Sequence, residues 1–369
     1  DYLKTNPRDG EASYWLSRIL LEAGVQSRAL ALASGAIDSG FDTPAARAQR
    51  LYAAFLRYFI FLGNTGFTSL HPRGADFLKI DLEKMAAAPE SPDRALAELI
   101  GRSIERRYPD VLSRTESPTR DRRVQVVRWN AQLALLREQR DLVTRSKDAG
   151  AAFSQLLSAV GEEADPLSLF LASQLMTLKD YTADPLKFYG ERLKGVKAVT
   201  PDVFLWKAVL LERSGDHHRF LEDLRNVLAL DPEDTLALLY QKAFLMTRLR
   251  PNVAEADQLG REIVRELEPL VARGSPCAAP HLLVGAGYLI IGNRKKAEQT
   301  FQSCFVRYGD PAAWNPGLVT GMESLFALVR WSGKEGPGFA VLAGRFLLEL
   351  EIPSGMLYIE EARLALEPE

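Results

Sequence analysis

The stretch that decides the fold runs from Pro201 to Pro232 and reads PDVFLWKAVLLERSGDHHRFLEDLRNVLALDP. Its apolar residues recur at the three- and four-residue spacing of an amphipathic helix, first in a segment around Trp206 and again in a segment around Leu224. A break at Gly215 separates the two segments, and the proline at the end closes the second one. Because the turn is so short, we predict two antiparallel helices packed as a hairpin.

Two other stretches share the register of this segment when 34-residue repeats are counted from Gly10, Pro201 and Ala278. A small residue lets a neighbouring helix pack closely at that point, and a glycine seven residues later lets the first helix end in a tight turn. The sequence therefore predicts a stacked array of helix hairpins, and alternating strand patterns are scarce. The small residues at place 8 are Ser17, Ala208 and Gly285, and the glycines at place 15 are Gly24, Gly215 and Gly292.

Between these repeats the periodicity is less regular, and it predicts helix pairs of uneven length. A capping serine before Pro118 is a good helix start, so we expect one long helix from Pro118 to Lys147. Gly63 to Gly74 is expected to form an inserted loop. The other expected helices cover residues 10–23, 27–39, 75–88, 93–108, 149–160, 166–179, 185–197, 201–213, 217–231, 234–249, 253–273, 278–291, 294–308, 322–331, 338–351 and 356–366.

These elements predict four regions along the chain. We expect N-terminal repeat helices over residues 1–62, an irregular helical region over 63–164, a C-terminal array over 165–352 and a capping helix over 353–369. Pro7 falls at place 32 of a preceding repeat, so Tyr2 to Asn6 is interpreted as the last turn of a helix that begins upstream. We therefore expect the chain to be part of a longer polypeptide or a mature form cut near a repeat boundary; a frayed ordinary N-terminus is the alternative.

Composition narrows the class of protein. The chain has 369 residues, of which 47% are hydrophobic, and this content is enough for a sizeable core. Its 46 basic and 48 acidic residues give a net charge of −2, so no global attraction to nucleic acid or anionic lipid is expected. No run of eighteen apolar residues occurs, so we expect no membrane insertion. The compartment is left open between the cytoplasm and the periplasmic face of a cell envelope.

With this register, the chain resembles the tetratricopeptide repeat (TPR) family. That family has bulky residues at places 4 and 7, small residues at 8, 20 and 27, larger ones at 11 and 24, and proline at 32. Phe220 occupies place 20 of the middle repeat, where the family has a small residue, and this puts the packing there in doubt. The residues that carry the resemblance are Leu16, Ser17, Leu20, Ala29, Ala33 and Ala36, then Phe204, Ala208, Leu211, Leu224 and Pro232, and finally Gly285, Tyr288, Gly292, Ala297, Phe301 and Cys304.

The resemblance implies an all-α fold: a right-handed superhelix of antiparallel helix pairs with irregular central repeats. Related α-solenoids are the alternative, since any helix-hairpin array needs small contact residues. The resemblance to the TPR family further implies a concave, largely apolar groove that binds a peptide or an amphipathic helix of another protein. The expected groove residues are Tyr14, Arg18, Leu205, Val209, Tyr240, Phe244, Leu282 and Ala286.

Two alternatives bear on this groove. Neighbouring helices could already cover its side chains, which would then belong to the core. Chaperone-binding TPR domains use lysine at place 5 and asparagine at place 9 of their first repeat, and here these places hold Tyr14 and Arg18. We therefore do not expect a clamp for chaperone C-termini.

Catalytic patterns are poor. The adjacent His217 and His218 have no third metal ligand nearby, and His281 is expected to be a packed core imidazole. No phosphate-binding glycine loop and no serine nucleophile elbow occur, so we predict no metal, no cofactor and no enzymatic activity. A helical enzyme remains an alternative, for which Glu83, Arg128 and Asp141 are the kind of titratable groups to inspect, but the sequence names no catalytic set.

Positive charge is concentrated in one central region. Acidic residues are interleaved with these arginines and aromatic residues are few, so a nucleic-acid surface is not expected. A solvated helix face is the simpler interpretation, and docking onto an acidic protein surface is the functional one. The cluster comprises Arg102, Arg106, Arg107, Arg114, Arg120, Arg122, Arg123 and Arg128.

The two cysteines, Cys277 and Cys304, are too few for a disulfide framework. In a hairpin that starts at Ala278, the residue before the first helix lies near the last turns of the second. Cys277 and Cys304 could therefore form a disulfide, or remain two unlinked small side chains. We interpret the whole chain as a noncatalytic adaptor; the alternative is an accessory region of a larger enzyme or of a membrane-anchored envelope assembly.

Overall fold

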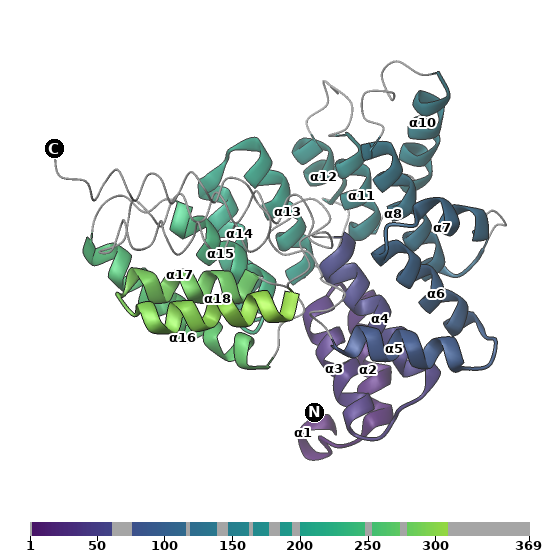
Figure 1. Ribbon diagram of the computed structural model, residues 1–369. Helices are drawn as coiled ribbons and strands as arrows, with labels where there is room; N and C mark the ends of the chain where they lie inside the picture. The colour runs from purple at the N-terminus through teal and green to yellow at the C-terminus, as the bar shows by residue number, and fades with distance from the viewer. Residues whose placement is uncertain are drawn as a thin grey trace. The chain divides into compact units, whose positions relative to one another are not determined.

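The computed structural model describes residues 2–60, 76–115, 119–138, 147–161, 165–176, 185–193, 200–247, 253–273 and 279–308. Within these ranges the regular elements are helices and no strand occurs (Figure 1). The chain contacts divide it into a first compact unit, residues 1–60 and 80–237, and a second compact unit, residues 61–79 and 238–369. The all-α prediction is confirmed.

Most of the helices in the described ranges belong to the first compact unit. They are α1 (Tyr2–Thr5), α2 (Gly10–Glu22), α3 (Gln26–Asp38), α4 (Pro44–Ala54), the π-helical segment η1 (Phe55–Ile60), α6 (Pro92–Ile104), α7 (Tyr108–Arg114), α8 (Arg122–Glu138), α10 (Lys147–Gly161), α11 (Pro166–Met176), α12 (Pro185–Leu193), α13 (Pro201–Ser214) and α14 (His217–Leu230).

The second compact unit holds α16 (Val253–Arg273), α17 (Ala279–Ile290) and α18 (Arg294–Tyr308). Two further helices, α5 (Asp76–Ala87) and α15 (Thr235–Thr247), have residues in both units. The expected helices over 322–331, 338–351 and 356–366, and the expected loop from Gly63 to Gly74, lie outside the described residues.

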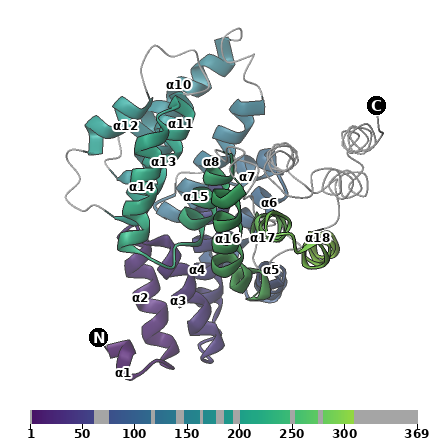
Figure 2. The same cartoon turned by 90° about the vertical axis from the view of Figure 1, so that its left-hand side faces the viewer.

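The three repeats form the predicted hairpins, α2–α3, α13–α14 and α17–α18, and Figure 2 shows α2 and α3 side by side. The first helix of each hairpin ends at a glycine with positive φ: 75° at Gly24, 79° at Gly215 and 76° at Gly292. The amide after each glycine donates to the carbonyl five residues earlier, as from Asn293 to Tyr288 at 2.8 Å. This Schellman geometry requires a left-handed residue, which explains the glycine at place 15.

Small residues at place 8 allow the two helices of a hairpin to approach closely. A Cβ atom on Gly285 would lie 2.5 Å from the Phe301 ring, so only glycine fits beneath that aromatic residue. In the first repeat, the Ser17 hydroxyl donates to the Ala29 carbonyl at 2.7 Å. Phe220 is fully buried in α14. The middle hairpin therefore forms with an aromatic residue at place 20.

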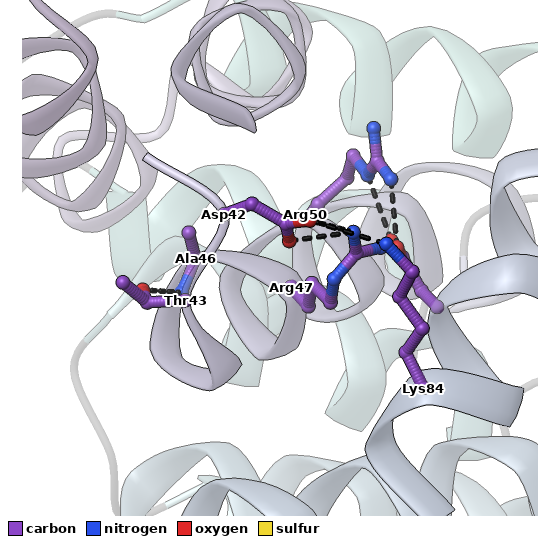
Figure 3. A network of polar contacts seen from close by, with 7 residues as sticks. Asp42, Thr43, Ala46, Arg47, Arg50 and Lys84 are labelled. Carbon is purple, nitrogen blue, oxygen red and sulfur yellow. Dashed lines mark hydrogen bonds and ion pairs between the residues drawn. The ribbon is translucent and has the colours of Figure 1, made fainter. Parts of the chain in front are cut away.

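A buried ion network joins α4 to α5 (Figure 3). Arg50 binds the Asp81 carboxylate with two hydrogen bonds of 2.7 Å each, and Arg47 contacts the same carboxylate. Arg47 also pairs with Asp42 at 2.5 Å, and Lys84 reaches Asp42 at 3.2 Å. Because Asp81 is fully buried, its two arginine partners are what make its charge tolerable.

Two predicted helix boundaries were wrong. The helix expected from Pro118 begins at Arg122, because Thr119, Arg120 and Asp121 are not helical and the Asp121 carboxylate accepts the Arg123 amide at 2.9 Å. The helix expected over 93–108 ends at Ile104. After it, Arg106 adopts the left-handed conformation, with a φ of 60°, that glycine usually adopts at the end of a helix. Because no glycine is present, the sequence does not indicate this helix end.

The helix α4 was not among the expected helices. Thr43 caps it, since its hydroxyl accepts the Ala46 amide at 3.2 Å, and Pro44 occupies its first turn. The region boundaries expected near residues 62, 164 and 352 remain a prediction. The contacts of the chain group it as the two compact units given above.

Candidate functional site

A pocket of about 850 Å³ opens within the first compact unit. It is lined by residues of α2 and the turn that follows, α4, η1, the start of α8, α11 and α13. Elements distant in sequence therefore converge on one space. Its charged lining residues are Arg18, Glu22, Arg120, Asp121, Arg122, Arg123 and Asp165, and its apolar ones include Leu21, Tyr52, Leu56, Val126, Leu167 and Trp206.

Two arginines of the pocket are exposed, Arg18 on α2 and Arg120 just before α8. The Arg18 guanidinium lies over the Trp15 ring, 5.2 Å from its centroid. Within the described ranges, neither arginine has a carboxylate within ion-pair distance. Their charges are therefore available to a ligand.

The other two pocket arginines are held by carboxylates. Arg122 pairs with Asp165 at 2.5 Å, and its guanidinium stacks 4.5 Å from the Trp129 ring centroid. Arg123 binds Asp121 at 2.9 Å and Asp93 at 3.1 Å. These two arginines build the wall of the pocket and have less charge to offer.

The carboxylate beside Arg123 stays ionised. Burial alone would raise the pKa of Asp121, but the hydrogen bonds from the Arg123 side chain and amide lower it overall. The arginines farther along the central cluster are also paired: Arg102 with Asp110 at 3.2 Å and Arg114 with Glu98 at 3.0 Å. The interleaved charges seen in the sequence thus form ion pairs across the surface of α6 and α7.

The apolar part of the pocket is closely packed. Trp206 stacks on Phe170, with ring centroids 5.6 Å apart and an interplanar angle of 15°. Tyr52 is only 5% exposed, and burial raises its pKa above the ordinary value, so its hydroxyl stays neutral. These side chains form an inner surface that is in place before any ligand arrives.

Next to the pocket, a buried cluster joins the N-terminal helices to α13 and to the turn between α14 and α15. Arg57 of η1 binds Asp234 at 2.6 Å, and both side chains are almost fully buried. The backbone amide of Gln26, at the start of α3, donates a hydrogen bond of 2.9 Å to the Asp202 carboxyl group, 176 residues away in sequence. These bonds hold together elements from the two ends of the first compact unit.

The positive charge of the Arg57 guanidinium acts on Asp202 as well as on Asp234. Burial alone would lower the pKa of Arg57, but Asp234 beside it raises that pKa, so Arg57 stays charged. Burial raises the pKa of Asp202 to about 8; Arg57 opposes this rise, while Asp234 and Asp231 add to it. At neutral pH Asp202 thus carries a proton in a large share of molecules.

The predicted groove residues fall into two groups. Arg18 is exposed and lines the pocket, and Phe244 is half-buried. The other six are buried within the helix packing, so a ligand would reach them only after a rearrangement. They are Tyr14, Leu205, Val209, Tyr240, Leu282 and Ala286.

Of the other predicted groups, His281 is buried in α17, as expected for a core imidazole, and burial lowers its pKa to about 4. Cys304 is buried in α18, whereas Cys277 lies outside the described residues, so the disulfide remains a prediction. Glu83 is exposed and Arg128 half-buried, and Asp141 also lies outside the described part.

Neither a cluster of potential metal ligands nor a helix long and apolar enough to span a bilayer occurs among the residues whose structure is described. No cluster of three or more His, Cys, Asp or Glu side chains there has a metal-binding arrangement. No helix in these ranges has the length and apolar character needed to cross a bilayer.

The convergence of the lining residues on one pocket was not predicted from the sequence. Arg120 and Arg123 precede or begin a helix whose start was misplaced, and Thr200 and Trp206 approach the same space from the far end of the unit. The concentration of arginines between residues 102 and 128 was the one available signal, but it does not reveal which of them stay unpaired.

No protein-family model matches the chain, and no curated protein matches it. Among solved structures, it is similar to the human IFIT1 dimer with PPP-AAAA, at 15% identity over 95% of this chain and 90% of that one, with a TM-score of 0.44. The APC/C hetero-tetramer Cut9–Hcn1 gives 13% identity, coverages of 97% and 76%, and a TM-score of 0.39. Yeast Tom70 gives 12%, coverages of 98% and 86%, and 0.37.

The fold class rests on the chain itself: helix hairpins that keep the TPR register, glycine-terminated first helices and small residues at the contact places. The protein is a TPR-like helical-repeat protein, and its first compact unit contains a charged pocket.

Proposed function

We propose that the protein is a noncatalytic scaffold that binds a segment of a partner protein in the pocket of the first compact unit. The observation that supports this most is the pocket itself, which is lined from several helices and combines available arginines with a packed apolar wall. Mixed linings of this kind orient a ligand through a few polar groups while its apolar surface is buried.

The size of the pocket favours a short segment over a folded domain. A helix about 10 Å across occupies roughly 420 Å³ per turn of 5.4 Å, so a pocket of about 850 Å³ holds some two turns or a short extended stretch. Rigid walls lower the ordering cost of binding such a segment. The pocket would serve equally in an independent adaptor and in the accessory region of a larger enzyme or membrane-anchored assembly.

The test is selection of binders from a random-peptide display library on the purified protein, followed by affinity measurement on pocket-filled variants. Leu21→Trp and Leu167→Trp place bulk in the pocket lining, and Val306→Trp, at an exposed position in the second compact unit, is the matched control. We expect the selected peptides to lose binding to the first two variants and to keep it for the control. Peptides that bind all three variants equally would contradict the proposal, as would a selection that yields no binder.

A further inference from the structure

We propose that the segment bound in this pocket is acidic and aliphatic, with carboxylates on Arg18 and Arg120 and an aliphatic side chain on the adjacent pair Trp15 and Ile19. This inference rests on the proposed function and names the chemistry of the ligand. It commits to a protein segment; nucleic acid is an outcome of the test.

The charge of the lining supports a carboxylate-bearing ligand. Four arginines and three carboxylates line the pocket, and the described ion pairs engage Arg122 and Arg123. Arg18 and Arg120 are left with exposed guanidinium groups and, within the described ranges, no acidic partner. A guanidinium binds a carboxylate through two parallel hydrogen bonds, so each of these residues can hold one acidic side chain.

The apolar part of the surface lies on the same helix. Trp15 and Ile19 are 50% and 61% exposed and stand one turn apart on α2. Arg18 connects them to the pocket, because its guanidinium lies over Trp15 while the same side chain lines the cavity. An aliphatic residue close to an acidic one would therefore bury apolar area as the ion pair forms.

A nucleic acid fits the same surface less well. A phosphodiester backbone carries a negative charge on every nucleotide, which is more than the two available arginines can match beside the carboxylates of Glu22, Asp121 and Asp165. Base stacking needs accessible aromatic faces, but Tyr52 and Trp206 are only 5% and 3% exposed. Trp15 is the exposed aromatic residue beside the pocket, and Arg18 already covers part of it.

The experiment uses fluorescence anisotropy with fluorescein-labelled octapeptides on the full chain. The probe alternates glutamate and leucine, and its comparison peptides replace glutamate by glutamine, or leucine by serine. A labelled single-stranded octa-adenylate RNA is the fourth probe. The variants are Arg18→Gln with Arg120→Gln, and Trp15→Ser with Ile19→Ser. Arg28→Gln is the control, since Arg28 is an exposed arginine on α3 outside the pocket lining.

We expect the acidic–aliphatic peptide to bind, and the paired arginine substitutions to weaken it at least tenfold, as loss of charge-assisted hydrogen bonds implies. The serine pair should weaken it severalfold, and Arg28→Gln should leave it unchanged. Affinity should fall between 50 and 300 mM salt because the arginines are exposed. Circular dichroism and thermal melting of each variant establish that it is folded.

Several results would overturn the inference. The glutamine peptide binding as tightly as the glutamate peptide would remove the carboxylates from recognition, and tighter binding of the RNA would assign the pocket to another class of ligand. Unchanged affinity in the arginine variant would refute the assigned residues. If display yields neutral peptides that are lost in Leu167→Trp, the proposed function stands and this inference fails; if no peptide binds in either experiment, both fail.

Discussion

Asp202→Asn tests whether a protonated Asp202 carboxyl stabilises the contact between α3 and α13 in the first compact unit. The Asp202 carboxyl is buried where the start of α3 meets α13, and it accepts the Gln26 amide at 2.9 Å. Arg57 is the nearby cation, and Asp234 binds it directly. Asparagine keeps an oxygen for the Gln26 amide but has no proton to lose, so the substitution removes titration with little change in shape.

The sign of the effect follows from the raised pKa. Asp202 has a pKa of about 8 in the folded protein against an ordinary value of 3.8, because burial disfavours its charged form. Between these values the folded protein holds a proton that the unfolded chain has released. The free energy of unfolding of the wild type therefore falls as pH rises through this window, by up to about 1.4 kcal/mol per pH unit for one proton.

Urea unfolding followed by far-UV circular dichroism, at pH 5, 6, 7 and 8, measures this effect. We expect Asp202→Asn to gain free energy of unfolding relative to the wild type at each step, and the gain to level off above pH 8. Other titrating groups cancel in this difference. A difference between the two proteins that stays constant from pH 5 to pH 8 would refute the reasoning, because Asp202 would then be ionised in the folded state throughout.

Three further substitutions test the packing. Gly285→Ala should lose about 1–3 kcal/mol of stability by overpacking against Phe301, and Phe301→Leu should relieve part of that loss in a double-mutant cycle of denaturation free energies. Asp81→Ala should cost about 3–5 kcal/mol, measured the same way, since it removes the buried carboxylate that Arg47 and Arg50 share; an unchanged midpoint would mean that water or other groups replace that carboxylate. Gly215→Ala should cost about 1–2 kcal/mol in thermal melts, because φ is 79° there while a methyl group meets no atom within 4 Å.

The hairpins were predictable because their signals are local. A glycine such as Gly292 is needed where the helix reverses, and a small residue such as Gly285 is needed where a facing ring approaches, so both requirements leave single-residue marks. Arg106 left no such mark, since a left-handed arginine is sterically costly and the sequence around it continues the helical pattern. Pro118 gave a false start because the Asp121 cap lies within the next turn.

Exposure within the hairpins was harder to predict. Tyr14 and Arg18 were both expected in the groove from their places in the repeat, yet Tyr14 is buried and Arg18 is exposed. Tyr14 packs with Phe41, at a centroid distance of 5.5 Å, and Phe41 belongs to the chain beyond α3. The register gives the face of a helix that a residue occupies, but the cover over that face comes from other segments.

The pocket depends on contacts that no local pattern encodes. Arg120 and Arg122 look alike in sequence, because they stand on either side of the same acidic residue, Asp121. Arg122 loses its availability to Asp165, 43 residues away, whereas Arg120 has no such partner within the described ranges. The arginine that remains available to a ligand is therefore set by the position of Asp165, just before α11. That position depends on how the irregular central helices pack against α8.

The pocket and the contact of the buried Asp202 share a residue. Gln26 both lines the cavity and donates its amide to Asp202, so one residue joins the pocket wall to the contact that closes the unit. The hydrogen bond from the Gln26 backbone amide favours the ionised carboxylate, but burial disfavours it more, so loss of the proton favours opening of this buried contact and of the α2–α3 turn with it. Affinity for an acidic peptide would then fall above pH 8 in the wild type and hold steady in Asp202→Asn. An equal fall in both proteins would separate the pocket from the closing contact.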